Sequence, residues 1–244
     1  MVFLLSGLAA CSGPQAPAGS MQVIVEVDGS EAPILDGSAA PFVAAIDRVG
    51  LVSQSSPRRY IQVLKPVRIT KDGAVGELRP YARGLRIEAE IEFDHPVIGR
   101  QALEVDVSPA TFRHGIARAR TFGFLRDVAK LWSAGYALGA SFENTLVITE
   151  DRVLNPEGLR SPDEFVRHKV LDAIGDMALA GAPLLAAYKT VRGGHRLNYA
   201  VLSALMADTS AWRVVETSEP VRRIRGHADV AAGLVAPAYG PDKS

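Results

Sequence analysis

The sequence has little cysteine, no excess of either charge and no long apolar run. Its single cysteine, Cys11, cannot form an internal disulfide. Lysine plus arginine number 27, as do aspartate plus glutamate, so the chain lacks the basic surface of a nucleic-acid-binding protein. No run reaches the roughly 18–20 apolar residues of a membrane helix. We therefore expect a soluble protein of a reducing compartment, with no nucleic-acid partner and no stable membrane insertion.

The chain has 244 residues, of which 48% are hydrophobic, enough for one large domain or two small ones. Its first twenty residues allow two interpretations. The segment Leu8-Ala9-Ala10-Cys11 is similar to the end of a bacterial lipoprotein signal. However, the apolar run before it begins at Met1 without the lysine or arginine that a secretory signal needs. The alternative is that this segment is the end of an apolar helix.

Hydrophobic periodicity predicts an α+β fold. Alternating residues predict strands over 21–28, over 183–188 and, between residues 60 and 107, in YIQVLKPVRIT, VGELRPY, LRIEAEIEF and ALEVDV. Helices are predicted over 39–49, 122–133, 161–180 and 197–206. Ser38 is the expected N-cap of the first, and Ser161 and Glu164 form a capping box in the third. Residues 51–59 form the expected linker, and the chain is expected to fray after Thr217. Strands followed by helices, without regular β-α-β alternation, favour α+β layers over a doubly wound sheet.

The helix predicted over 161–180 carries two side chains of the kind that bind metals. His168 and Asp172 are four residues apart, so both project from one helical face and can reach one ion. Imidazole and carboxylate are both zinc ligands. Lys169 is adjacent to His168, and Asp176 continues the same face one turn later. The alternative for such a pair is a solvated, charged helix face.

Another histidine, His195, follows Arg192-Gly193-Gly194 and precedes the last predicted helix. A glycine pair lets the backbone approach another group closely and can direct the imidazole into a cleft. With a free pKa of about 6.5, histidine is suited to act as a general acid or base. The alternative is a water-exposed histidine at the start of a helix.

Six long stretches of the chain, in the family's order, resemble the UDP-3-O-acyl-N-acetylglucosamine deacetylases. They are VIVEVDGSEAPILDGSAAPFV (23–43), IEFDHPVIG (91–99), ARTFGF (119–124), LGASF (138–142), RVLNPEGLRSPDEFVRHKVLDAIGD (152–176) and GGHRLN (193–198). The resemblance extends from Val23 to about Val215. It implies a cytoplasmic, zinc-dependent enzyme that removes the N-acetyl group from a UDP-linked acylated glucosamine in lipid A synthesis.

The resemblance also implies two α+β domains, each a sheet layered on a pair of helices, with the active site between them. Residues 1–55 correspond to a remnant of the first domain, which we expect to be largely missing. Residues 56–217 correspond to the second domain, and residues 218–244 to a C-terminal tail. An insert at about 124–153 builds a hydrophobic passage for the acyl chain of the substrate in this family.

The motifs imply a role for each matched residue. Two of the three zinc ligands correspond to His168 and Asp172, and the general acid that protonates the leaving amine corresponds to His195. The carboxylate that orients this histidine corresponds to Asp176, and the groups that stabilise the oxyanion correspond to Lys169 and Thr121. The residues expected to contact substrate are Phe122, Phe124, Gly139 and Arg192.

The sequence departs from the family pattern at its N-terminal end. The family has an adjacent Glu-His pair, in which glutamate is the general base and histidine the third zinc ligand. Val2 and Phe3 stand at the corresponding positions, and there is no histidine before His95. We therefore expect impaired activity in a truncated chain. Under the same resemblance, Leu8-Ala9-Ala10-Cys11 is the end of the family's first-domain helix.

Three functions remain open at this point: the zinc-dependent deacetylase, an inactive remnant that binds the UDP-sugar, and an exported lipoprotein. Zn²⁺ is the expected cofactor and UDP-3-O-acyl-N-acetylglucosamine the expected ligand. We expect a monomer. The other three histidines, His95, His114 and His227, are expected to be structural or on the surface.

Overall fold

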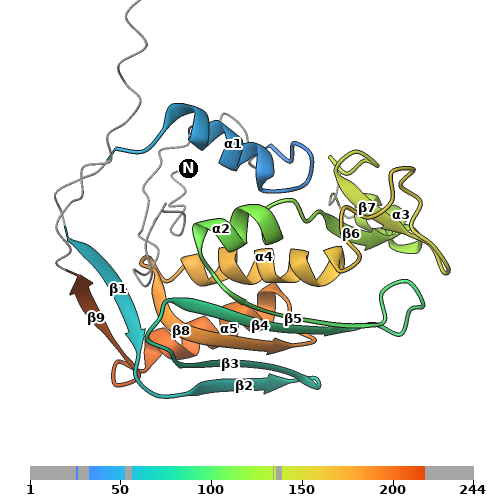
Figure 1. Ribbon diagram of the computed structural model, residues 1–244. Helices are drawn as coiled ribbons and strands as arrows, with labels where there is room; N and C mark the ends of the chain where they lie inside the picture. Colours follow the sequence, from blue (N-terminus) through green and yellow to red (C-terminus); the bar gives the residue numbers. More distant parts are fainter. Residues whose placement is uncertain (1–25, 27–32, 53–56, 134, 136–138, 218–244) are drawn as a thin grey trace, which may run out of the picture.

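A computed structural model gives the fold (Figure 1) and describes residue 26 and residues 33–52, 57–133, 135 and 139–217. Val2, Phe3, Cys11, nearly all of the strand predicted over 21–28 and the tail after Thr217 lie outside these ranges. In chain order the elements are α1 (Ala40–Val49), β1 (Arg58–Val63), β2 (Val67–Lys71), β3 (Ala74–Pro80), β4 (Leu85–Glu92), β5 (Arg100–Asp106), α2 (Pro109–Thr111), the π-helix η1 (Phe112–Ile116), β6 (Thr121–Phe124), α3 (Leu125–Ser133), β7 (Thr145–Ile148), α4 (Glu164–Ala178), β8 (Leu184–Val191), α5 (His195–Ala207) and β9 (Trp212–Thr217).

Seven of the described strands form one mixed sheet with β8 at its centre. Strand β8 pairs in parallel with β1 and β4 and antiparallel with β3. Strands β2, β5 and β9 extend the sheet through antiparallel pairs with β3, β4 and β1. The alternation in β4 directs Ile87, Ala89 and Ile91 into the core, as the sequence pattern predicts. The predicted α+β class is therefore confirmed.

Helices α4 and α5 pack against each other and against the sheet, α4 on β4 and β5 and α5 on β2 and β3. In Figure 1, α4 lies between the sheet and α2, so it has protein on two sides. This explains why Phe165, Val166, Val170 and Ala173 are completely buried. The described helices are all too short or too polar to cross a membrane.

The helix predicted over 122–133 is wrong in its first three residues. The segment Thr121–Phe124 is strand β6, which pairs in parallel with β7, and α3 makes the connection between them. A short apolar run can form either a strand or a helix, and here the pairing with β7 decides. The β6-α3-β7 unit is a small second sheet beside α4, a local β-α-β arrangement that the sequence pattern did not reveal.

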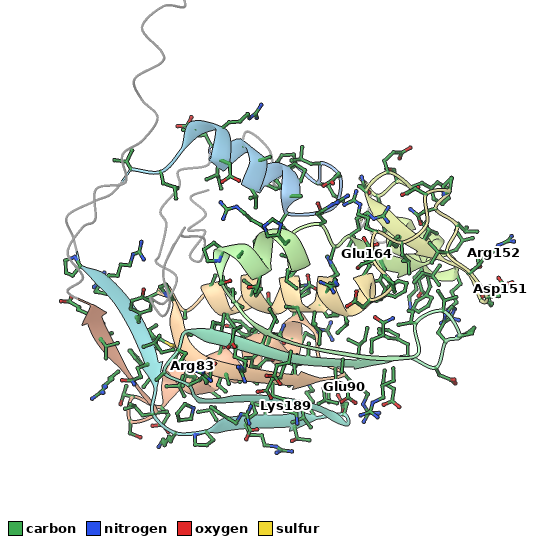
Figure 2. All side chains as sticks on the ribbon, viewed as in Figure 1. Arg83, Glu90, Asp151, Arg152, Glu164 and Lys189 are labelled. Carbon is green, nitrogen blue, oxygen red and sulfur yellow. The ribbon has the colours of Figure 1, made fainter. Side chains whose placement is uncertain are left out.

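The capping box predicted at Ser161 is also wrong. Helix α4 begins at Glu164, its N-cap is Asp163, and no side chain caps it. The Glu164 carboxylate is fully buried and accepts hydrogen bonds from the Arg120 backbone N–H and Nε, both at 3.0 Å. Figure 2 shows Glu164 at the end of α4 that faces β6. The Glu164 carboxylate, which would complete the capping box, is therefore bound by the buried Arg120 guanidinium instead.

Two other predicted boundaries move, and one strand of the main sheet was missed. Helix α1 has Ala39 rather than Ser38 as its N-cap, although Ser38 Oγ still accepts from the Ala40 N–H at 3.3 Å. Helix α5 begins at His195, two residues earlier than predicted. Strand β9 was not predicted. It is antiparallel to β1 at the edge of the sheet.

Candidate active site

His168 and Asp172 lie on one face of α4, as their spacing predicts. His168 Nε2 is 3.3 Å from Asp172 Oδ1. The two side chains are 11% and 14% exposed, so both are largely withdrawn from water. A solvated helix face would leave both side chains in water, and the burial argues against that alternative.

The surroundings of His168 fix its protonation. Nδ1 lies 3.3 Å from the carbonyl oxygen of Ala119, which can only accept, so Nδ1 carries the proton of this bond. Burial is the main cause that lowers the pKa of His168 below its ordinary value, although the charge of Asp172 opposes it. The ring is thus held neutral, with the lone pair of Nε2 directed toward Asp172. This is the form in which a histidine binds a metal through Nε2.

His195 reaches the same carboxylate from α5. It is the first residue of that helix, and its Nε2 lies 3.9 Å from Asp172 Oδ2. Its Nδ1 lies 2.9 Å from Asp176 Oδ2, so the proton on Nδ1 is donated to a carboxylate. The side chain is 67% exposed, which leaves Nε2 open to a ligand from solvent. Both sequence interpretations of His195 thus describe part of its position, since it starts a helix and also faces the buried pair.

Gly193 is required by this approach. A Cβ atom added there would lie 2.1 Å from Thr190 Oγ1 and 3.2 Å from Leu197 Cδ2. A side chain at this position would therefore require Thr190 and Leu197 to shift at the turn that presents His195. At Gly194 an added Cβ meets nothing within 4 Å, so only the first glycine of the pair is constrained by packing.

Lys169 and Phe122 complete the surroundings of the pair. Lys169 Nζ is 3.2 Å from Asp172 Oδ2 and 5.5 Å from the centre of the Phe122 ring. The Phe122 ring lies edge-on to His168, with 6.4 Å between ring centres. Thr121 precedes Phe122 as the first residue of β6. The ammonium group of Lys169 therefore lies beside both the Asp172 carboxylate and the Phe122 ring.

The other predicted contact residues make their contacts elsewhere. The Phe124 ring lies 5.3 Å from His95 and 4.7 Å from the Arg126 guanidinium. Gly139 accepts a hydrogen bond from Asn144 through its carbonyl. Arg192 donates to the carbonyl of Gly73 at 2.8 Å and lies 3.6 Å from Glu92. Their assignment to substrate binding stays a prediction. His95, by contrast, is buried and bonded to the Thr149 carbonyl at 2.7 Å, as expected for a structural histidine.

A small pocket opens between α4, α5 and the strands β4 and β8. Its walls are formed by Ala89, Glu90, Ile91, Lys169, Asp172, Thr190, Gly193, Gly194 and Asn198. Figure 2 labels Glu90 on β4 and Lys189 on β8, the two strands that contribute to it. Asp172 and Lys169 line the pocket, and Asp172 also lies beside His168 and His195. The site therefore has a recess on the side that faces the sheet.

The His168–Asp172 pair fits two positions of a zinc ion. Zinc bonds to imidazole nitrogen and carboxylate oxygen of about 2.0–2.2 Å, at a tetrahedral angle, place the two ligand atoms about 3.4 Å apart. The observed separation between Nε2 and Oδ1 is 3.3 Å. Within the described ranges, no group of three or more histidine, cysteine, aspartate or glutamate side chains is arranged to hold a metal. The described residues therefore offer a metal two ligands.

Sequence reasoning missed Asn198, which lies against the site. Its Nδ2 donates to Asp176 Oδ2 at 2.8 Å, and its side chain is almost fully buried. Its position three residues after His195, on the same face of one helix, could have indicated that Asn198 lies near the site.

The chain matches the family model described as UDP-3-O-acyl N-acetylglycosamine deacetylase over residues 10–207. Proteins named UDP-3-O-acyl-N-acetylglucosamine deacetylase from Brucella ovis, Brucella canis and Brucella melitensis biotype 2 are each 51% identical to it over 199 residues. Each alignment covers 81% of this chain and 69% of the relative. The chain therefore belongs to the UDP-3-O-acyl N-acetylglycosamine deacetylase family.

Proposed function

We propose that this chain carries the metal-binding and acid half of a zinc-dependent deacetylase. Its reaction is hydrolysis of the N-acetyl group of UDP-3-O-acyl-N-acetylglucosamine in lipid A biosynthesis. Membership of the family supports the reaction. The observation that supports the residue roles is the convergence of His168 and His195 on Asp172, at 3.3 and 3.9 Å, from two different helices.

In this proposal His168 Nε2 and Asp172 hold the zinc. The Ala119 carbonyl and burial keep His168 neutral, so Nε2 is available as a ligand without loss of a proton. Bound zinc supplies Lewis acidity, which polarises the amide carbonyl and lowers the pKa of a bound water. The family resemblance implies a third ligand from an adjacent Glu-His pair, and no such pair occurs in this sequence.

The reaction breaks the amide C–N bond and forms a C–O bond from water, giving acetate and a free amine. The leaving nitrogen takes a proton from His195, whose Nε2 is directed to the site while Nδ1 donates to Asp176. Asp176 stabilises the protonated imidazole and fixes its orientation. The proton lost by the attacking water passes to a base, which the resemblance places in the Glu-His pair.

Two further groups stabilise the charge that develops on the amide oxygen. The Lys169 ammonium, 3.2 Å from Asp172, provides a positive charge beside the metal ligand. The hydroxyl of Thr121 provides a hydrogen-bond donor at the start of β6. Both roles come from the motif match and are compatible with the proximity of Lys169 to Phe122.

Substrate contacts are assigned by the same match. Phe122 lies beside the metal ligands, and Phe124 continues β6 away from them toward His95. We propose that this aromatic strand contacts the nucleotide or the acyl chain, with Gly139 and Arg192 at the edges of the site. Helix α3 and strand β7 fall within the insert expected at about 124–153, and β6 leads into it. We propose that these three elements form the wall of the acyl passage.

The domain assignment also stays a proposal. The sheet and its two covering helices lie within residues 56–217, which supports a second domain in that range. Assignment of residues 1–55 to a first domain and of 218–244 to a tail rests on the resemblance, as do a monomeric state and a cytoplasmic location. Lipidation of Cys11 concerns a residue outside the described ranges.

A second candidate, for the residues of this chain taken alone, is binding of zinc and the UDP-sugar without turnover, since no adjacent Glu-His pair occurs among them. The test measures zinc affinity, UDP-sugar binding and acetate release for the chain as it stands. It measures the same quantities for a fusion in which a family segment with a Glu-His pair precedes residue 21. We expect acetate release from the fusion and a loss of about 10²–10⁴ in rate after His195→Ala. A folded, zinc-loaded fusion that releases no acetate would contradict the deacetylase proposal. Sugar binding by the chain without acetate release supports the second candidate for the chain alone.

A further inference from the structure

The acid histidine is the exposed end of a hydrogen-bonded chain that runs into the core. His195 Nδ1 lies 2.9 Å from Asp176 Oδ2 and 3.1 Å from Oδ1, and Oδ2 also accepts from Asn198 Nδ2 at 2.8 Å. Asn198 Oδ1 in turn accepts from the Tyr188 hydroxyl at 2.6 Å. Exposure falls along this path, from a 67% exposed imidazole to a Tyr188 side chain with no exposure.

The direction of each bond is fixed by the chemistry of its partners. The Asp176 carboxylate can only accept, so Asn198 must present its NH₂ group to it. The amide oxygen then faces Tyr188, and an oxygen that only accepts requires the hydroxyl to donate. Burial, the largest cause, raises the pKa of Tyr188 to about 12, so the hydroxyl keeps the proton that it donates.

The path joins three elements that are separate in the sequence. Asp176 lies on α4, His195 and Asn198 on α5, and Tyr188 on β8. His195 and Asn198 are three residues apart on one helix face, so both can form hydrogen bonds with the same carboxylate. A carboxylate held by the histidine alone could rotate about its side-chain bonds. The second donor restrains this rotation, because it holds Oδ2, the oxygen nearer to His195 Nδ1.

We propose that Asn198 and Tyr188 are positioning residues for the acid of this site. Asn198 holds Asp176 Oδ2 in line with His195 Nδ1, and Tyr188 holds the Asn198 amide in the orientation that does so. As a result the proton of neutral His195 stays on Nδ1, and Nε2 is the atom that exchanges a proton with the substrate. This inference rests on the role of His195 in the proposed function, but its geometry is independent of turnover.

The test determines the tautomer of His195 by long-range ¹H–¹⁵N NMR on the full chain, at a pH where the ring is neutral. Tyr188→Phe removes only the hydroxyl and leaves the Asn198 amide free to turn. Asn198→Asp replaces the donor with an oxygen that repels Asp176. We expect each variant to lower the ratio of the Nδ1–H to the Nε2–H form on the order of fivefold, the worth of one hydrogen bond. Tyr199→Phe makes the same chemical change at a residue that is 64% exposed on α5 and should leave the ratio unchanged.

The outcomes separate the two proposals. If Tyr188→Phe and Asn198→Asp lower thermal stability but leave the tautomer ratio at the wild-type value, the residues only support the fold and the positioning inference is wrong. If the ratio falls as expected while the fusion enzyme releases no acetate, the positioning holds and the deacetylase proposal fails. In an active fusion, Tyr188→Phe should lower kcat several-fold and leave KM unchanged. If the Asn198→Asp variant does not fold, the tautomer ratio of the Tyr188→Phe variant alone tests the positioning inference.

Discussion

The buried ion pair between Arg120 and Glu164 allows a sharp test of what holds β6 against α4. Both side chains have no exposure to solvent, with 3.0 Å between Arg120 Nε and Glu164 Oε1. Burial alone would lower the pKa of Arg120, but hydrogen bonds and charges from Glu164 and Glu157 outweigh it and hold this pKa above its ordinary value. The guanidinium therefore remains charged in the core and depends on these carboxylates.

Glu164→Gln preserves the shape of the side chain and removes its charge. Breaking one partner of a buried pair costs about 3–5 kcal/mol, because the other charge stays buried without compensation. The cost should be at least about 3 kcal/mol. Glu157 remains and the glutamine oxygen can still accept from the Arg120 backbone N–H, but the glutamine NH₂ group would face the Arg160 N–H, from which Glu164 Oε2 accepts at 2.6 Å. For a chain of this size a loss of about 3 kcal/mol corresponds to a fall in Tm of about 6–12 °C.

Two further variants make the test specific, and calorimetry or circular dichroism gives each Tm. Glu157 also pairs with Arg120 but is 51% exposed, so Glu157→Gln should cost no more than about 1 kcal/mol. Replacing both members of the buried pair, with Arg120→Met and Glu164→Leu together, removes the unpaired charge and should cost less than Glu164→Gln alone. Equal shifts for Glu164→Gln and Glu157→Gln, or a double variant less stable than the single one, would refute the reasoning.

Three other outcomes follow from the geometry. Gly193→Ala should destabilise the fold by about 1–3 kcal/mol, because its Cβ would lie 2.1 Å from Thr190 Oγ1, whereas Gly194→Ala should be close to neutral in the same urea titration. His168→Ala should weaken zinc binding by more than about tenfold in a chelator competition, since it removes a ligand rather than a supporting group, and His195→Ala should not; equal losses would argue against His168 as a ligand. Asp47→Asn, which breaks a 2.6 Å pair with Arg113 at an aspartate that is 51% exposed, should change the free energy of unfolding by less than about 1 kcal/mol, and a larger loss would mean that this pair anchors α1.

The strands between residues 58 and 106 could be predicted because one face of the sheet is buried. Alternation of Ile87, Ala89 and Ile91 with charged residues specifies both the strand and the face that turns inward. The spacing of His168 and Asp172 was equally informative, since a helix fixes the direction of side chains four residues apart. In both cases a local pattern carries the structural information.

The errors occur where a distant partner decides the structure. Residues 121–124 form a strand because β7 pairs with them, and that contact is not visible in four residues of sequence. Glu164 has the right position for a capping box, but Arg120, 44 residues earlier, takes its carboxylate. In the sequence Asn198 is an ordinary polar residue of a predicted helix. Its role depends on α4 and β8, which place Asp176 beside its amide nitrogen and Tyr188 beside its amide oxygen. Each of these depends on tertiary contacts that local propensity does not encode.

The same three residues of chain, 119–121, connect the stability of the fold to the position of His168, the proposed metal ligand. The Ala119 carbonyl holds His168 Nδ1, Arg120 anchors the segment to the buried start of α4, and Thr121 begins the strand beside the site. Because α4 also carries His168, the ion pair fixes both ends of the Ala119–His168 hydrogen bond relative to each other. Replacing Arg120 should therefore disturb the orientation of His168 as well as the stability of the fold.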